Sequence, residues 1–143
     1  MSLFLFYKIS AAWWSGVKVV SVNEETAITK IRYSWFNQNP FRSVYFACLA
    51  MTAELSTGIM AFTYIRKNKL PVSMLLTGMQ ASFVKKATGR IQFKCDQGAE
   101  IRAAIDKCIA TKESVTVNVD SQGSNEAGEK VADFTYTWSY KAR

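Results

Sequence analysis

Residues 43–65 carry a single charged side chain, Glu54, and this stretch constrains the fold more than any other feature of the chain. Its length would permit a transmembrane helix. An acidic side chain at mid-membrane costs about 2.5–3.5 kcal/mol on insertion scales, however, and the stretch also contains several hydroxyl groups. The rest of the sequence supplies amphipathic strands that need a helix to cover them. We therefore predict that residues 43–66 form a buried core helix, with a membrane span as the alternative.

Alternating apolar and polar side chains predict strands on both sides of this helix. The predicted strands span residues 17–22, 26–36, 72–85, 88–94, 115–119 and 130–141, with Gly78 weakening the third strand or marking a bulge in it. Residues 2–14 are expected to form a short aromatic helix, and residues 99–111 an amphipathic helix capped by Asp96. This order predicts an α+β fold in which an antiparallel sheet wraps around one long central helix.

No linker, repeat or low-complexity tract divides the sequence, so we expect one domain covering residues 1–143. One face of the last strand, formed by Phe134, Tyr136, Trp138 and Tyr140, is expected to pack in its core. A sheet with a single covering helix leaves an edge and an apolar surface exposed. The protein is therefore expected to form a homodimer, or a tetramer.

The chain contains no histidine, which excludes His-based catalytic triads, His-ligated metal sites and the usual general base near neutral pH. Cys48, Cys95 and Cys108 are widely spaced and lack a metal-binding pattern, so we expect reduced, buried thiols in a cytoplasmic protein. The net charge of +7 suggests an anionic partner, although a solvated surface is the commoner explanation of such a charge. Because the basic residues form no run of five or more, a nucleic acid is not the expected partner.

Glu54 is the most unusual residue, because it is the only charge in a helix that we expect to be buried. A lone buried carboxylate is costly unless it is paired, hydrogen-bonded or protonated. Burial would raise its pKa, which suits a general base or an acid that is kept neutral. The alternative is a structural role, in which Glu54 meets a dimer partner or a neighbouring Thr or Tyr hydroxyl. On the residues alone, both roles stay open.

Asn39 and Pro40 precede the predicted helix and form the second candidate feature. The Asn39 side chain is placed either to cap the helix start, which its position favours, or to reach toward a ligand. Unpaired backbone N–H groups near Tyr45 and Phe46 would be free to hold a carbonyl oxygen or a phosphate.

The segment from Asn39 to Glu54 resembles hotdog-fold thioesterases of the phenylacetate-pathway type. Those proteins show an Asn, a His-Gly-Gly motif six residues later, and an Asp or Glu fifteen residues after the Asn. Asn39 and Glu54 keep this spacing, and the predicted order of helices and strands is similar to the hotdog fold over most of the chain. The sequence is similar above all to an uncharacterised branch, a domain of unknown function, in which an aromatic pair and an Ala replace His-Gly-Gly.

The resemblance implies roles for four residues of this chain. Glu54 would activate water or attack a thioester, and the backbone N–H of Phe46 would bind the thioester oxygen. Asn39 would orient the acid or the water. Ser73, on the strand that follows the helix, would hold the nucleophilic water.

The sequence departs from the family at the motif itself, where Tyr45-Phe46-Ala47 replaces His-Gly-Gly. A backbone N–H survives this replacement, but Phe46 lacks the close approach that Gly permits. Since one oxyanion-hole donor is worth about 2.7–4 kcal/mol, a blocked approach would be enough to abolish hydrolysis.

The expected substrate contacts lie in two places. Tyr45, Ala47 and Thr57 belong to the predicted helix and its start. Lys85, Lys86 and Arg90 flank a predicted hairpin turn at residues 87–89, which is either a plain basic turn, the reading that the residues favour, or a contact for a phosphate of coenzyme A. Coenzyme A would then be part of the substrate, and no other cofactor and no metal are expected.

Three functions follow as hypotheses. The first is an acyl-thioester hydrolase that acts on acyl-coenzyme A or on an acyl carrier protein. The second is a non-catalytic module that binds an acyl chain or lipid, with Glu54 in a structural role. The third is a membrane-associated protein anchored by residues 43–65.

Overall fold

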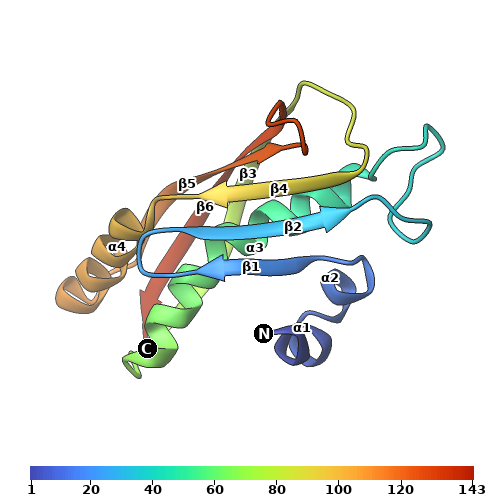
Figure 1. The fold of residues 1–143 in the computed structure, drawn as a ribbon. Coiled ribbons are helices and arrows are strands. Elements are labelled where there is room, and N and C mark those ends of the chain that lie inside the picture. The colour runs from blue at the N-terminus through green and yellow to red at the C-terminus, as the bar shows by residue number, and fades with distance from the viewer.

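The computed structural model describes residues 1–143 and contains a six-stranded antiparallel sheet that curves around one long helix (Figure 1). The helices are α1 (Ser2–Lys8), α2 (Ser10–Trp14), α3 (Phe46–Lys67) and α4 (Gly98–Thr111). The strands are β1 (Lys18–Val22), β2 (Ala27–Arg32), β3 (Val72–Phe83), β4 (Arg90–Cys95), β5 (Val115–Ser124) and β6 (Lys130–Ala142). The predicted α+β class and the sheet around a central helix are confirmed.

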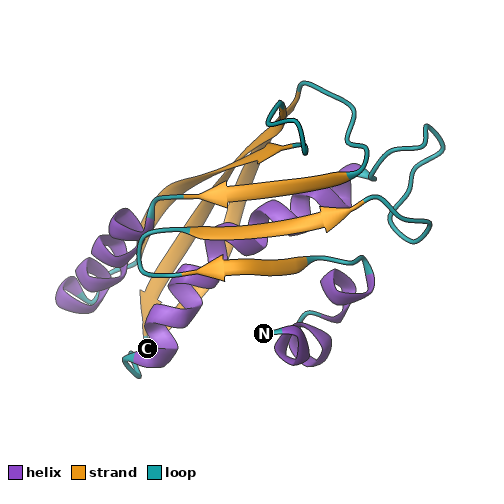
Figure 2. Ribbon diagram, in the orientation of Figure 1, coloured by secondary structure: helices purple, strands orange, loops and turns teal.

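The long helix α3 is buried because the sheet covers it along most of its length (Figure 2). It is long and apolar enough to cross a membrane, but most of it lies inside the protein. Its hydroxyl groups are accommodated in the core because Thr52, Ser56 and Thr57 each donate a hydrogen bond to a carbonyl of the preceding turn. The prediction of a buried core helix is therefore confirmed.

The inner face of the sheet follows the predicted alternation. Ile91, Phe93 and Cys95 of β4 are buried, and so are Phe134, Tyr136, Trp138 and Tyr140 of β6. The sheet is also tied directly to α3, because the Thr29 hydroxyl of β2 donates to the Thr52 carbonyl at 2.7 Å. The three cysteines are buried and unpaired, as the sequence predicted.

Several element boundaries differ from the prediction. The N-terminal helix is broken at Ile9, where the backbone leaves the helical region at φ −135° and ψ 61°. No side chain caps α4, whose N-cap is Gln97, so the predicted cap at Asp96 is wrong. Strand β2 ends at Arg32, and Trp35 beyond it is 82% exposed.

Strand β5 is longer than predicted, because the polar residues 120–124 continue it instead of forming a loop. Two small residues explain this. Gly123 lies under the Phe93 ring, where a Cβ would come within 2.5 Å, and the buried Ser121 hydroxyl shares a hydrogen bond of 2.7 Å with Ser56 of α3.

The bulge at Gly78 of β3 is confirmed by a register shift between Leu76 and Gly78.

The predicted hairpin at residues 87–89 is wrong. Strands β3 and β4 are not neighbours, because β5 and β6 lie between them in the strand order β1-β2-β4-β5-β6-β3. The segment after β3 therefore crosses from one edge of the sheet toward its middle. Strand β3 becomes an edge strand that pairs only with β6.

The start of α4 docks so closely on the turn before β2 that only glycine fits at position 98. A Cβ on Gly98 would lie 1.9 Å from the Glu24 carbonyl oxygen, whereas a Cβ on Gly78 would lie 3.8 Å from its nearest neighbour. Gly98→Ala is expected to lower the free energy of unfolding by about 2–3 kcal/mol, because backbone must move to relieve the clash. Urea denaturation of Gly98→Ala beside Gly78→Ala measures this, and equal stability of the two variants would contradict it.

Candidate functional site

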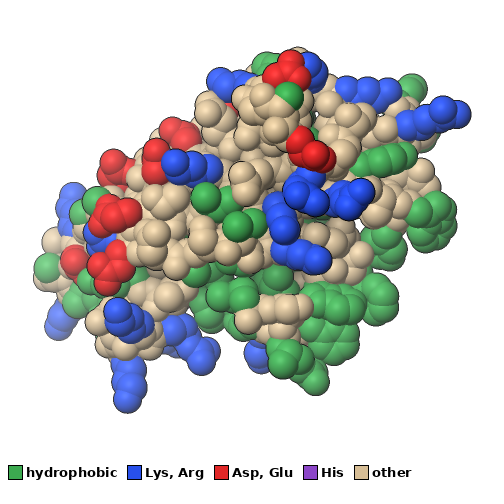
Figure 3. Space-filling model, viewed as in Figure 1, with side chains coloured by type: hydrophobic (Ala, Val, Ile, Leu, Met, Phe, Trp, Pro, Cys, Tyr) green, Lys and Arg blue, Asp and Glu red, His purple; other side chains and the backbone are tan.

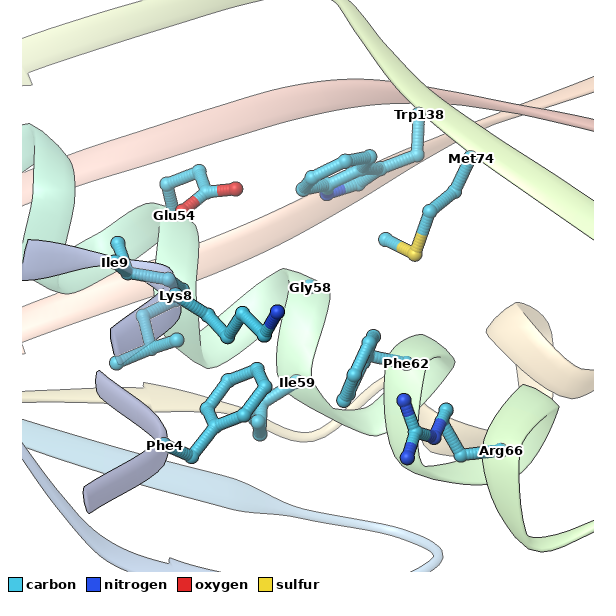
Figure 4. Close-up of a pocket in the computed structure, with 11 residues that line it drawn as sticks. Phe4, Lys8, Ile9, Glu54, Gly58, Ile59, Phe62, Arg66, Met74 and Trp138 are labelled. Carbon is cyan, nitrogen blue, oxygen red and sulfur yellow. The ribbon is translucent and has the colours of Figure 1, made fainter. Parts of the chain in front are cut away.

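A cavity of about 430 Å³ lies along the middle of α3 (Figure 4). Helix α1 forms one wall and the inner face of the sheet forms another. Its lining residues are Phe4, Lys8, Ile9, Glu54, Leu55, Gly58, Ile59, Phe62, Arg66, Met74 and Trp138. Most of them are apolar, and a cavity of this size and lining is typical of a small-molecule site.

Glu54 places its carboxyl group in the wall of this cavity. Its side chain is half-buried, and this burial raises its pKa from 4.5 to about 7, because the charged form loses part of its water. No side chain or backbone group of the chain donates a hydrogen bond to the carboxyl group, and no cation pairs with it. The carboxyl group can therefore exchange its proton near neutral pH, as a general acid or base must.

The backbone around Glu54 is held by two side chains of β6. The Trp138 indole donates to the Thr57 hydroxyl at 2.9 Å, and that hydroxyl donates to the Glu54 carbonyl at 2.8 Å. The Tyr136 hydroxyl donates to the Ala50 carbonyl at 2.6 Å, one turn earlier. Thr57 was predicted to contact substrate, but its side chain is fully buried and its hydroxyl is already used as donor and acceptor. In the structure it positions Trp138 against α3.

Asn39 organises the loop before α3 and does not cap the helix. Its side-chain oxygen accepts from the backbone N–H groups of Phe41 and Ser43, and its side-chain nitrogen donates to the Ser43 hydroxyl at 2.9 Å. The helix N-cap is Tyr45, whose side chain makes no cap hydrogen bond. The predicted cap is wrong because the loop continues for several residues beyond Asn39.

Asn37, which the sequence analysis did not single out, is the buried anchor of the same loop. Its side-chain nitrogen donates to the carbonyls of Ser15 and Arg32, and its oxygen accepts from the Ser34 N–H. One side chain thus ties together the end of α2, the end of β2 and the approach to α3.

The start of α3 lies apart from Glu54. Tyr45 and Phe46 are exposed, and the backbone N–H groups of Phe46 and Ala47 donate no hydrogen bond within the chain. Eight residues of helix separate Phe46 from Glu54, which corresponds to about 12 Å along the axis. The start of the helix, formed by Tyr45, Phe46 and Ala47, does not line the cavity.

Ser73 and the basic turn also lie away from the cavity. Ser73 is exposed on the face of β3 opposite Met74, which lines the cavity, so this chain does not bring Ser73 to Glu54. Lys85 is paired with Glu129, and it lowers the pKa of that carboxyl group. Lys86 is exposed.

Arg90 belongs to a row of cations on the outer face of the sheet, which Figure 3 shows as a group of basic side chains over the front strands. Arg32 pairs with Arg90 across β2 and β4, and Lys18 pairs with Lys30 across β1 and β2. None of these four side chains forms an ion pair. Like charges in direct register weaken a sheet, so this face suits an anion.

Most of the cavity wall was not predicted from the sequence. Lys8 and Phe4 come from a helix far from Glu54 in sequence, and Arg66 lies three turns further along α3. The spacing of Glu54, Gly58, Phe62 and Arg66 at every fourth residue was the available signal, since it places them on one helix face.

The family model "Domain of unknown function (DUF4442)" matches residues 5–140. The chain belongs to this DUF4442 family. This confirms the resemblance to the hotdog thioesterase superfamily and to its uncharacterised branch. No curated protein matches the sequence.

Solved structures share the fold of this DUF4442 protein at low sequence identity. A protein of unknown function from Pseudomonas aeruginosa, described as "Probable Thioesterase", has a TM-score of 0.86 and 20% identity over 99% of this chain and 94% of that one. A protein of unknown function from Chlorobaculum tepidum has a TM-score of 0.85 and 13% identity, over 99% and 92%. A variant of another Pseudomonas aeruginosa thioesterase has a TM-score of 0.69 and 10% identity, over 90% and 84%. These similarities confirm the hotdog fold.

The raised pKa of Glu54 makes the stability of the protein depend on pH. In the folded state this carboxyl group holds its proton more tightly than in the unfolded chain, so stability is greatest below pH 4.5 and falls as the pH rises toward 7. Glu54→Gln removes the free-energy cost of ionising a buried carboxyl group. It is expected to raise the free energy of unfolding at pH 8 by about 1–3 kcal/mol, with little gain at pH 5.

Denaturant unfolding at the two pH values measures this difference. Glu113→Gln, which alters an exposed carboxylate in the loop before β5, is the control and is expected to change stability little at either pH. A Glu54→Gln protein that is no more stable than wild type at pH 8 would show that the carboxyl group is well solvated.

Proposed function

We propose that this protein is an acyl-thioester hydrolase in which Glu54 acts as the general base. The single observation that carries the proposal is an unpaired carboxyl group with a pKa of about 7 in the wall of an apolar cavity. The chain has no histidine, so a carboxyl group of this kind is its natural base at neutral pH. The thioesterase names of proteins with the same fold support this choice.

The reaction needs one proton to be moved twice. Glu54 accepts a proton from water as the water oxygen attacks the thioester carbonyl carbon. The tetrahedral intermediate then expels the thiolate, which takes the proton from Glu54 and leaves as the thiol. The products are a carboxylic acid and the free thiol of coenzyme A or of an acyl carrier protein.

The backbone N–H groups of Phe46 and Ala47 are the proposed oxyanion donors, and they support a site shared between two copies of the chain. They lie about 12 Å along α3 from Glu54 of the same chain, too far to share one carbonyl group. The helix start of a second copy would supply them instead. Met79 and Phe83 on the inner face of edge strand β3 are exposed, with Phe83 beside Phe46, and they offer an apolar surface for that copy.

A non-catalytic acyl-binding protein is the second candidate. The observation that favours it is the pair of exposed rings at the helix start, where the Tyr45 and Phe46 centroids lie 4.9 Å apart. These side chains stand where an oxyanion would approach the backbone. The cavity and Glu54 would then serve binding alone.

The carrier of the acyl group is proposed to be anionic, as coenzyme A and acyl carrier proteins both are. The unpaired cations Lys18, Lys30, Arg32 and Arg90 support this proposal. A reducing compartment such as the cytoplasm suits the three free cysteines.

Hydrolysis of acyl-coenzyme A thioesters of graded chain length tests the proposed function. The wild-type rate is expected to rise with pH through an apparent pKa near 7, as Glu54 loses its proton. Glu54→Gln is expected to lower kcat at least about 100-fold, because a general base contributes at least that factor. Glu113→Gln is the matched control and is expected to keep wild-type activity.

Two results would contradict the proposal that Glu54 drives hydrolysis. Acyl-thioester binding by wild type without any turnover would favour the binding module. Turnover that survives in a folded Glu54→Gln protein would assign the base to another group.

Analytical ultracentrifugation tests the proposed second copy. Met79→Lys places a charge on the apolar inner face of β3, and it is expected to shift the protein from dimer to monomer. Gln80→Lys places the same charge on the outer face of the same strand and is expected to leave the dimer intact. A wild-type protein that sediments as a monomer would contradict the shared site.

A further inference from the structure

The cavity that contains Glu54 is also lined by two solvent-exposed cations that have no ion-pair partner in the chain. Lys8 of α1 and Arg66 of α3 both line it, and neither forms an ion pair (Figure 4). Lys67, the next residue, is already paired with Glu24 at 3.7 Å. The cavity therefore has a carboxyl group toward one end and unpaired positive charge elsewhere along its wall.

The cavity adjoins a groove between α1 and residues 59–67 of α3. A second hollow of about 340 Å³ shares Phe4, Ile59, Phe62 and Arg66 with the first, so the two adjoin. Twelve residues of helix separate Glu54 from Arg66, which corresponds to about 18 Å along α3. An elongated molecule would fit this groove better than a compact one.

The apolar side chains that line the groove limit the kind of chain that lies in it. Phe4, Ile9, Ile59, Phe62 and Met74 make up much of the lining, and none of them has a hydrogen-bonding side chain. A pantetheine arm carries amides and a hydroxyl that would lose their hydrogen bonds to water here. A hydrocarbon chain makes no hydrogen bonds to water and so loses none here. The acyl group is therefore the part that runs along the groove.

Arg66 is well placed to bind an anion at the end of such a chain. Its guanidinium lies 5.5 Å from the centroid of the Phe62 ring, which restricts its freedom without using its hydrogen-bond donors. A planar guanidinium binds a carboxylate through two parallel hydrogen bonds. The Lys8 ammonium, which points toward the middle of the cavity in Figure 4, adds a second positive charge.

We propose that this protein binds acyl groups that carry a carboxylate at their far end, with Arg66 binding that carboxylate, Lys8 adding positive charge from the middle of the cavity, and the apolar side chains of the groove holding the chain. This inference rests on the proposed function for the position of the thioester at Glu54. It goes further by naming the substrate class, a medium-length ω-carboxyacyl thioester.

Calorimetric titration with thioether analogues of acyl-coenzyme A, which cannot be hydrolysed, tests the recognition itself. The probes are an ω-carboxyalkyl analogue, an alkyl analogue of equal length, and coenzyme A alone. Wild type is expected to bind the ω-carboxyalkyl analogue about tenfold more tightly than the alkyl analogue, since a hydrogen bond to a charged group contributes enough for such a factor. Arg66→Met and Lys8→Met are expected to reduce this preference, and the double variant to abolish it.

Lys107→Met, on the exposed side of α4, is the matched control and is expected to keep the preference. Equal binding of the two analogues by wild type would overturn the inference. Weaker binding of coenzyme A alone by Arg66→Met would also overturn it, because the cations would then bind the phosphates of the carrier and not the acyl carboxylate.

Turnover measured with the corresponding thioesters separates this inference from the proposed function. Binding of the ω-carboxyalkyl analogue that depends on Arg66, without hydrolysis of either thioester, would support the inference and contradict the hydrolase. Hydrolysis of both thioesters at equal kcat/KM, unchanged in Arg66→Met, would support the hydrolase and contradict the inference.

Discussion

The structure depends on the burial of α3, a helix with apolar residues on nearly all sides. Such a helix is stable in water only when other elements cover it. The sheet supplies most of this cover and helix α1 adds to it on another side, where the Phe4 and Phe62 rings lie 5.1 Å apart. The cover is incomplete along one face, and the cavity lies there.

Glu54 acquires its chemistry from this position. The burial that stabilises α3 also removes water from the only carboxyl group in the helix, which raises its pKa to about 7. The neighbouring hydroxyl of Thr57 is bound to Trp138 and to the helix backbone, and is therefore not available to the carboxyl group. A buried carboxyl group without a partner lowers the stability of the fold. A role in binding and releasing protons explains why the protein would keep Glu54 at this position.

The sequence predicted those features that depend on local pattern. The core helix, the inward face of β6 and the bulge at Gly78 all follow from periodicity or from a single residue type, and the spacing of Asn39 and Glu54 indicated the family. Features that depend on tertiary contacts were missed. Strand β5 continues through polar residues because Ser121 and Gly123 fit against α3 and Phe93. Strand order turned the expected hairpin into a crossover. The cavity wall from α1 could not be predicted, because no local pattern relates Lys8 to Glu54.

The central claim is that the carboxyl group of Glu54 is poorly solvated and titrates near neutral pH. Carbon-13 NMR of the glutamate side-chain carboxyl groups, with the Glu54 resonance assigned by comparison with Glu54→Gln, measures this directly. We expect a titration midpoint near pH 7. A midpoint near 4.5, the value of an ordinary glutamate, would show that water reaches the carboxyl group freely and would contradict the account.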